Sequence, residues 1–315
     1  MKVSVIIPAY NAAQYLAESV HSALQQPETA EVIIVDDGSR DNSLEVAYNL
    51  QKEDPRVKVL RHPDGINRGS AETRNVGIRV AQSEYVAFID ADDVFLHGRF
   101  ALTGKIFEQH PDAEGVYEAV KNLMGPNAVS FSKSVPLGAE PELHMVRKLV
   151  APEDLLTQLI DDPEGIILLQ GLCVKRKLFY KSGWFDPNFR IAQDMLLVKK
   201  LAAVGNLYPG SLTEPVSLRR IHDQNISFSE FKDRNPTRFL EADTLFKWSL
   251  NKKINPKNKN AILRLNYQQF LYRNNFSFGD GTARRKWIWH LLNISPSGIF
   301  YKETWKAMPF IGRFI

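Results

Sequence analysis

The first 110 residues alternate short apolar runs with segments whose apolar residues recur at helical spacing. The apolar runs, each four to six residues long, are at positions 3–8, 31–35, 57–61 and 85–90. The segments with helical spacing between them are at positions 12–25, 43–52 and 70–81. Nearly continuous apolar strands that alternate with helices are typical of a parallel sheet covered on both faces. The pattern therefore predicts an α/β fold of doubly wound type, with a nucleotide-binding half at residues 1–110.

The pattern after residue 110 is less regular. Two more strands and one amphipathic helix are expected, in that order, at positions 115–120, 170–175 and 194–204. Residues 230–315 are basic and aromatic, and their pattern favours helices. The pattern therefore divides the chain into an α/β domain at 1–229, with halves at 1–110 and 111–229, and a helical C-terminal region at 230–315.

Composition narrows the class of protein. The chain has 315 residues, of which 44% are hydrophobic and 24% charged, as in globular proteins with a substantial core. A net charge of only +4 predicts no nucleic-acid partner. Cys173 is the only cysteine, which excludes an intramolecular disulfide and a cysteine-based zinc site. We expect no signal peptide, because the first strand begins at Val3, and no membrane span, because no run of 18 apolar residues exists. The expected location is the cytoplasm.

The sequence Asp-Ala-Asp-Asp at positions 90–93 directly follows an apolar run. Burying an ionised carboxylate costs several kcal/mol unless a cation or strong donors compensate. In an open α/β sheet, ligands bind at the carboxyl ends of the strands. Alternate carboxylates there suit a hard divalent cation that takes the rest of its ligands from water and a diphosphate. The alternative is an N-cap, with Asp92 or Asp93 starting a helix after Val94.

Three other strand ends carry polar or turn residues, at positions 8–11, 36–39 and 65–69. Each of these alone is explained by ordinary turn chemistry. Together with the acidic segment they outline a crevice at one edge of the sheet. In it, Asp37 can accept a hydrogen bond from a base, Arg74 can contact phosphate, and Asp90 and Asp92 can hold a metal ion.

The order and spacing of these segments resemble glycosyltransferase family 2 enzymes of the GT-A fold. The segments that carry the resemblance are Val-Ser-Val-Ile-Ile-Pro-Ala-Tyr-Asn at 3–11, Ile-Val-Asp-Asp-Gly-Ser at 34–39, Asn-Arg-Gly at 67–69, Arg-Asn-Val-Gly at 74–77 and Phe-Ile-Asp-Ala-Asp-Asp at 88–93. The match is close over about the first 100 residues and looser to about residue 227.

The resemblance implies a binding site for a nucleotide-diphosphate sugar. Pro8, Ala9 and Tyr10 would line the nucleobase pocket, and Asp37 would bond the base, which is usually uracil in this family. Arg74 would lie near the diphosphate.

The resemblance also implies a metal site. Asp90, with Ala91 beside it, would approach the ribose or donor sugar, and Asp92 would ligate Mg²⁺ or Mn²⁺ that bridges the two phosphates. His222 lies where family members have a histidine and a basic residue that close over the diphosphate and metal, so its imidazole is a further candidate ligand. The alternative for His222 is an ordinary hydrogen-bonded histidine.

The family's catalytic base is the Asp of a Glu-Asp pair that opens a helix. Here the pair is Gln193 and Asp194, so Asp194 is the candidate base. A carboxylate in this place can take the proton from an acceptor hydroxyl as that oxygen attacks the anomeric carbon, with inversion of configuration. Gln193 departs from the family pattern and removes a charge beside the base. The alternative for Asp194 is an N-cap of its helix.

Residues 284–292 and 302–315 mix basic, aromatic and apolar side chains. This composition fits an interfacial helix on an anionic membrane, which would make residues 284–315 a peripheral membrane contact. It fits equally well a helix that packs on the catalytic domain. The sequence leaves both readings open.

The sequence thus predicts an inverting, metal-dependent glycosyltransferase. It would move a sugar from a nucleotide-diphosphate donor, with UDP as the expected nucleotide, to a hydroxyl acceptor in glycan, polysaccharide or glycolipid synthesis. The alternative is a GT-A-like module that binds nucleotide sugar or glycan without catalysis. A sugar-phosphate nucleotidyltransferase would need a glycine-rich basic loop after the first strand, and residues 9–12 do not supply one.

Overall fold

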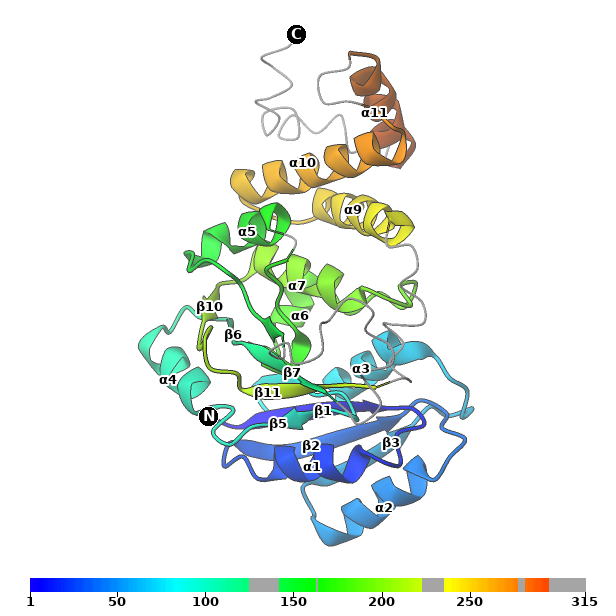
Figure 1. The fold of residues 1–315 in the computed structure, drawn as a ribbon, viewed down its shortest axis with the longest axis vertical. Helices are drawn as coiled ribbons and strands as arrows, with labels where there is room; N and C mark the ends of the chain where they lie inside the picture. Colours follow the sequence, from blue (N-terminus) through cyan, green and yellow to red (C-terminus); the bar gives the residue numbers. More distant parts are fainter. Residues whose placement is uncertain (125–141, 163, 223–234, 277–280, 295–315) are drawn as a thin grey trace.

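The computed structural model describes residues 1–124, 142–162, 164–222, 235–276 and 281–294 (Figure 1). Its centre is a seven-stranded sheet with the strand order β10-β6-β9-β4-β1-β2-β3. These strands are, in chain order, β1 (Val3–Ala9), β2 (Thr29–Asp36), β3 (Val57–Arg61), β4 (Tyr85–Phe88), β6 (Gly115–Tyr117), β9 (Leu172–Lys175) and β10 (Leu207–Pro209). All neighbours pair in parallel except β9, which is antiparallel to both β4 and β6. The expected α/β fold with a mostly parallel sheet is confirmed.

Helices cover both faces of this sheet, and alternate side chains of each strand point to opposite cores. Ile6 and Ile33 pack on the side of α3 (Gly69–Val80), whereas Val5 and Val32 pack on the side of α1 (Leu16–Leu24) and α2 (Ser43–Glu53). Figure 1 shows α1 and α2 below the sheet and α3 above it. These strands are apolar on both faces because both faces are buried.

A second, four-stranded sheet has the order β5-β11-β7-β8. Its strands are β5 (Val94–Phe95), β7 (Val120–Met124), β8 (Leu143–His144) and β11 (Ser217–Ile221). This sheet corrects two expectations. Residues after the acidic segment form β5 instead of a helix, so the N-cap alternative for Asp92 and Asp93 is wrong. The single strand expected at 115–120 is two strands that belong to different sheets.

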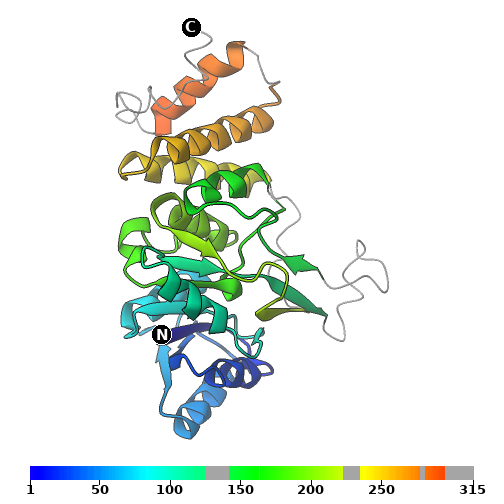
Figure 2. The same cartoon turned by 90° about the vertical axis from the view of Figure 1, so that its left-hand side faces the viewer.

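The remaining helices lie on the α3 side of the large sheet and beyond it. They are α5 (Leu155–Asp161), α6 (Leu178–Ser182), α7 (Gln193–Val204), α9 (Asn235–Leu250), α10 (Pro256–Arg273) and α11 (Gly281–Ile294). Helix α4 (Ala101–Gln109) is the exception, because it packs on the α1 side. Figures 1 and 2 show α9, α10 and α11 stacked at the end of the molecule farthest from α2. The expected domain boundary at residues 229 and 230 lies outside the described residues.

Helix α11 packs against α10 through its apolar face. Trp287 is fully buried, its ring lies 4.8 Å from that of Tyr267, and its Nε1 donates a hydrogen bond of 2.8 Å to Asn266 Oδ1. Trp287 and Leu291 belong to the same hydrophobic cluster as residues of the central sheet. Packing on the rest of the protein therefore explains Trp287 and Leu291 of α11. Residues 295–315 lie outside the described part, and in that part no helix combines the length and hydropathy needed to cross a bilayer.

Two tryptophans of α11 offer a matched test of this packing. Trp287→Ala should lower the free energy of unfolding by about 3–5 kcal/mol, because it leaves a large cavity and removes the hydrogen bond to Asn266 Oδ1. Trp289→Ala should change it by less than about 0.5 kcal/mol, because Trp289 is 68% exposed. Urea unfolding measures both values. Equal, small effects of the two substitutions on stability would contradict this packing, and reduced sedimentation of Trp289→Ala with anionic vesicles would indicate that the exposed side of α11 binds membranes.

Candidate active site

The carboxyl ends of β1, β2 and β4 meet at one edge of the large sheet. Ala9 pairs with Asp36 at the ends of β1 and β2, and β4 runs parallel to β1 on its other side. The segments at 8–11, 36–39 and 90–93 therefore lie along the same edge, as the parallel arrangement predicts.

The turn after β2 packs tightly against the loop before α3. Gly38 has φ +76°, and a Cβ at this position would lie only 2.6 Å from the backbone oxygen of Gly65. Glycine is therefore required here by both backbone conformation and space. Asp36 accepts hydrogen bonds from the backbone nitrogens of Gly38 and Ser39, at 3.2 and 3.3 Å. These contacts fix the shape of one wall of the crevice.

The carboxylate of Asp37 holds the loop that opens α3. Its Oδ1 accepts from the backbone nitrogen of Arg68 at 2.7 Å, and its Oδ2 accepts from that of Gly69 at 3.0 Å. His62 Nε2 lies 3.3 Å from Oδ1, and both side chains are buried. Asp37 thus has a structural role that the sequence analysis did not foresee, and its contact with a nucleobase stays a prediction.

The residues after β1 differ in exposure. Pro8 is half-buried and Ala9 is buried, whereas the Tyr10 side chain is 44% exposed. Asn11 adopts a left-handed conformation with φ +49°, and its Oδ1 accepts from the backbone nitrogen of Arg40 at 2.8 Å. The fixed turn leaves the Tyr10 ring as the aromatic surface that is available for stacking on a base.

The three carboxylates of residues 90–93 have different surroundings. Asp93 is buried and accepts from Gln170 Nε2 and from the backbone nitrogen of Arg220, the latter at 2.8 Å. Burial, followed by the neighbouring charges of Asp92 and Asp90, raises the pKa of Asp93 well above its usual value. Asp93 therefore serves to connect the segment with its neighbours.

Asp90 pairs with Arg74. Arg74 Nη2 lies 2.5 Å from Asp90 Oδ1, and the guanidinium lies 5.5 Å from the ring centre of Phe185. The Arg74 side chain is 8% exposed, whereas that of Asp90 is 37% exposed. The buried Arg74 Nε has no hydrogen-bond partner among the described residues. The structure thus brings together two residues that the sequence analysis assigns to the diphosphate and the donor sugar, although their contacts with a donor remain predictions.

Asp92 meets His222 across 130 positions of sequence. Asp92 Oδ2 lies 2.9 Å from His222 Nε2, and both side chains are partly accessible, at 25% and 11%. The His222 ring stacks on Tyr15 at 5.3 Å. Arg220 orients the same region, because its Nε donates to the backbone oxygen of Asp92 at 2.9 Å and its Nη2 pairs with Glu18. The pairing of β11 with β5 produces this contact.

The chemistry of this pair fits a divalent cation. A carboxylate oxygen and an imidazole nitrogen are both ligands of Mn²⁺ and, for the oxygen, of Mg²⁺. In the described part of the chain no group of three or more His, Cys, Asp or Glu side chains is arranged to hold a metal ion. Asp92 and His222 would therefore supply two ligands, and phosphate oxygens and water the others.

Asp194 lies in the first turn of α7. Ala192, which precedes the helix, has φ +59°, and the Asp194 carboxylate accepts from the backbone nitrogen of Met195 at 2.9 Å. The N-cap position belongs to Ala192, so the alternative that Asp194 caps the helix is wrong. The Asp194 side chain is partly exposed.

Helix α3 is joined to both sides of the crevice. The amide of Gln193, which is 6% exposed, donates to Ser70 Oγ on α3. Asn75 exchanges two hydrogen bonds of 3.0 Å with the backbone of Phe185, in the segment that leads to α7. Arg74, adjacent to Asn75, contacts Asp90. The same helix therefore positions the acidic edge and the start of α7.

Three residues near the site were not predicted from the sequence: Asn75, Tyr15 and Gln170. Asn75 stands in the Arg-Asn-Val-Gly segment, so a motif marked its position without showing its partner. Tyr15 and Gln170 carry no motif, and only the tertiary structure brings them to the site.

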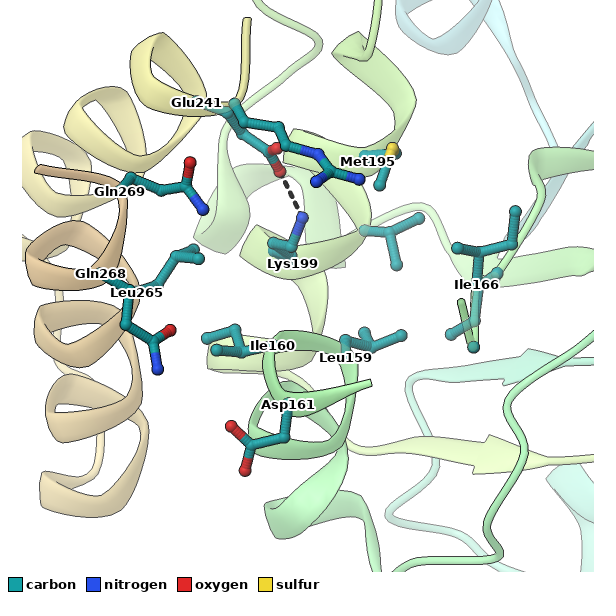
Figure 3. A pocket seen from close by; sticks show the side chains of 14 residues that line it. Leu159, Ile160, Asp161, Ile166, Met195, Lys199, Glu241, Leu265, Gln268 and Gln269 are labelled. Atoms are coloured by element: carbon teal, nitrogen blue, oxygen red, sulfur yellow. Dashed lines mark hydrogen bonds and ion pairs between the residues drawn. The ribbon is translucent and has the colours of Figure 1, made fainter. Parts of the chain in front are cut away.

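A cavity of about 330 Å³ lies between α5, α7, α9 and α10 (Figure 3). Its lining mixes aliphatic side chains with charged and amide ones, and the buried ion pair of Lys199 with Glu241 crosses it. Met195, the residue after Asp194, also lines it. The cavity does not include the acidic edge, where the carboxylates and Arg74 converge.

Comparison with known proteins identifies the family. Residues 4–122 match the model of Glycosyl transferase family 2. The chain is 32% identical over 230 residues to an uncharacterized glycosyltransferase of Nostoc sp., covering 71% of this chain and 66% of that protein. It is 36% identical over 248 residues to an uncharacterized glycosyltransferase of Rickettsia bellii, covering 76% of this chain but only 31% of that protein. It is 44% identical over 97 residues to the succinoglycan biosynthesis protein ExoU of Rhizobium meliloti, covering 31% of this chain and 28% of that protein.

Solved structures share the fold. TarS residues 1–349 of S. aureus in complex with UDP-GlcNAc superimposes with a TM-score of 0.65 at 20% identity, covering 98% of this chain and 82% of that one. The mannosyltransferase PcManGT of Pyrobaculum calidifontis, in complex with GDP-Man and Mn²⁺, gives a TM-score of 0.51 at 17% identity, covering 98% of this chain and 85% of that one. The chain belongs to glycosyltransferase family 2 and has the GT-A fold.

Proposed function

We propose that this protein is an inverting, metal-dependent glycosyltransferase that moves a sugar from a UDP-sugar to a hydroxyl of a glycan, polysaccharide or glycolipid. The contact of Asp92 with His222 beside the Arg74–Asp90 ion pair carries the proposal, because a carboxylate, an imidazole and a guanidinium then lie together at the edge where the strands end. A structural neighbour that binds UDP-GlcNAc and one that binds GDP-Man with Mn²⁺ support the donor class and the metal. The name of ExoU supports polysaccharide synthesis.

The donor would lie along the edge from Tyr10 to Asp92. The exposed Tyr10 ring, with Pro8 and Ala9 behind it, would hold the base. Each carboxylate oxygen of Asp37 already accepts one hydrogen bond from the loop before α3, and Asp37 would accept a further one from the base. Asp90 and Ala91 would contact the ribose or the donor sugar. Arg74 would hold the diphosphate through its remaining N–H groups.

Asp92 and His222 would hold Mn²⁺ or Mg²⁺ against the diphosphate. The ion supplies a Lewis acid that stabilises negative charge on the leaving nucleoside diphosphate. Arg220 fixes the backbone of Asp92, so the carboxylate is oriented before the donor binds. Preorganised charge of this kind is the main contribution that a protein makes to such reactions.

Asp194 would act as the general base. It would take the proton of the acceptor hydroxyl while that oxygen attacks the anomeric carbon from the face opposite the diphosphate, which inverts the configuration. Gln193 is neutral and donates a hydrogen bond to Ser70, so it stands beside the base without adding a second carboxylate.

Measuring donor hydrolysis tests the proposal. We expect the purified protein to release UDP from at least one of UDP-GlcNAc, UDP-glucose and UDP-galactose with Mn²⁺ or Mg²⁺, and to stop when EDTA is added. GDP-mannose is the comparison donor. The alternative, a non-catalytic binding module, is favoured by Gln193 in place of the family's Glu. It predicts metal-stimulated UDP binding in calorimetry with no hydrolysis of any donor and no transfer.

A further inference from the structure

Gln170 lies directly behind the acidic edge. It is 5% exposed and belongs to the short 3₁₀ turn at Leu169–Gly171, which precedes β9. Its side-chain Nε2 donates to Asp93 Oδ2 and lies 3.4 Å from Asp90 Oδ2. One amide nitrogen therefore contacts the first and the last carboxylate of the segment, while Asp92 between them faces His222.

A neutral donor suits this place for an electrostatic reason. Three carboxyl groups lie within four residues, and those that are buried need hydrogen-bond donors. A lysine at position 170 would place a positive charge against Asp90 and Asp93, next to the proposed metal ligand Asp92. The amide of Gln170 supplies hydrogen bonds without adding a charge of either sign.

The backbone of Gln170 is fixed from the opposite side. Its carbonyl oxygen accepts from Arg99 Nε at 3.0 Å, and Arg99 is fully buried in an ion pair with Glu118 at 2.7 Å. A Cβ at Gly171 would lie 2.2 Å from the backbone oxygen of Glu118, so the chain at this point is in close contact with β6 and its extension. Because the backbone of Gln170 is fixed, the position of its side-chain amide relative to Asp90 and Asp93 is restricted as well.

We propose that Gln170 is a positioning residue of the metal and donor site. It sets the places of Asp90 and Asp93, and through their shared backbone it sets the direction in which Asp92 faces His222. This inference rests on the proposed metal role of Asp92. Polar groups that orient metal ligands from behind commonly change metal affinity about 10- to 100-fold when they are removed.

Gln170→Met tests the proposal, because methionine keeps the length of the side chain and removes the amide. We expect the Mn²⁺ concentration for half-maximal UDP-sugar hydrolysis, and for half-maximal tightening of UDP binding in calorimetry, to rise at least about tenfold. UDP affinity without metal should change less than threefold, roughly the scatter of a surface substitution.

Gln26→Met is the matched control. Gln26 is also buried and hydrogen-bonded: its Oε1 accepts from the backbone nitrogen of Arg99 at 3.0 Å, and its Nε2 donates to Ser22 O at 2.9 Å. Both of these hydrogen bonds join Gln26 to residues outside the acidic segment. We expect Gln26→Met to lower the melting temperature and to leave the response to Mn²⁺ as in the unmodified protein.

Three outcomes separate the claims. A folded Gln170→Met protein with the normal Mn²⁺ response overturns the positioning role. An equal loss of response in Gln26→Met also overturns it, because general destabilisation would then explain the effect. If the unmodified protein shows no Mn²⁺ response at all, the proposed metal site fails first. Should Gln170→Met not fold, Gln170→Asn carries the same test, because its shorter amide cannot reach both carboxylates.

Discussion

Replacing Asp194 with asparagine is expected to reduce sugar transfer at least about a hundredfold while the protein stays folded and still binds its donor. A carboxamide is a very poor base at neutral pH, and the loss of a general base commonly costs about 10²–10⁴-fold. The substitution preserves size, and Asn can still accept the hydrogen bond from the backbone of Met195. Transfer to an acceptor and UDP binding in calorimetry are the two measurements.

Two further variants serve as controls for Asp194→Asn. Asp112→Asn removes a carboxylate just before β6, at the opposite edge of the sheet, where it accepts from Tyr208 and Asn206. It should transfer normally. Gln193→Glu restores the family's usual pair and should change the pH dependence of transfer without eliminating it. Near-normal transfer by folded Asp194→Asn would exclude this base and direct attention to other carboxylates near the acceptor.

Asp92→Asn is expected to abolish metal-dependent turnover and to remove the response of UDP binding to Mn²⁺. The change removes one formal charge and one ligand oxygen while the volume hardly changes. Since groups that only orient a ligand cost about 10- to 100-fold in metal affinity, loss of the ligand itself should cost more than about a hundredfold. Calorimetric titration of UDP with and without Mn²⁺ measures the effect.

His222→Gln tests the second half of the same pair. It should weaken the Mn²⁺ response less than Asp92→Asn, because a carboxylate is the stronger ligand for a hard cation. If Mn²⁺ still tightens UDP binding to Asp92→Asn as it does in the unmodified protein, Asp92 is not a metal ligand.

Much of the α/β domain was predictable because its strands are buried on both faces. The runs that became β1, β2 and β4 needed no alternation to be recognised. The segment at 115–120 was misread, because Glu118 interrupts an apolar run and is buried against Arg99, a partner 19 positions away. The helix expected after Val94 was wrong for a similar reason: β5 exists through its pairing with β11, in which Phe95 lies opposite Ser217.

The site residues also fall into those that the local sequence marks and those that only tertiary contacts bring in. Asp90, Asp92 and Asp37 follow strands, so local sequence marks them as residues of the edge. The proximity of His222 to Asp92 and of Gln170 to Asp93 depends on contacts 130 and 77 positions apart. No spacing rule reaches that far, and the resemblance to a family was needed to nominate His222 at all.

The pairing of β5 with β11 also has a kinetic consequence. Only two residues of β5 pair with β11, yet this contact closes a loop of more than a hundred residues, and closure of a long loop has an entropic cost that local contacts do not bear. The acidic segment can take its place as soon as β4 joins β1, whereas the imidazole arrives only when β11 has docked. Folding experiments that follow the sheet and those that follow the Asp92–His222 contact should therefore report different events. A chain cut between β5 and β11 would test whether β11 can dock on β5 without a covalent connection.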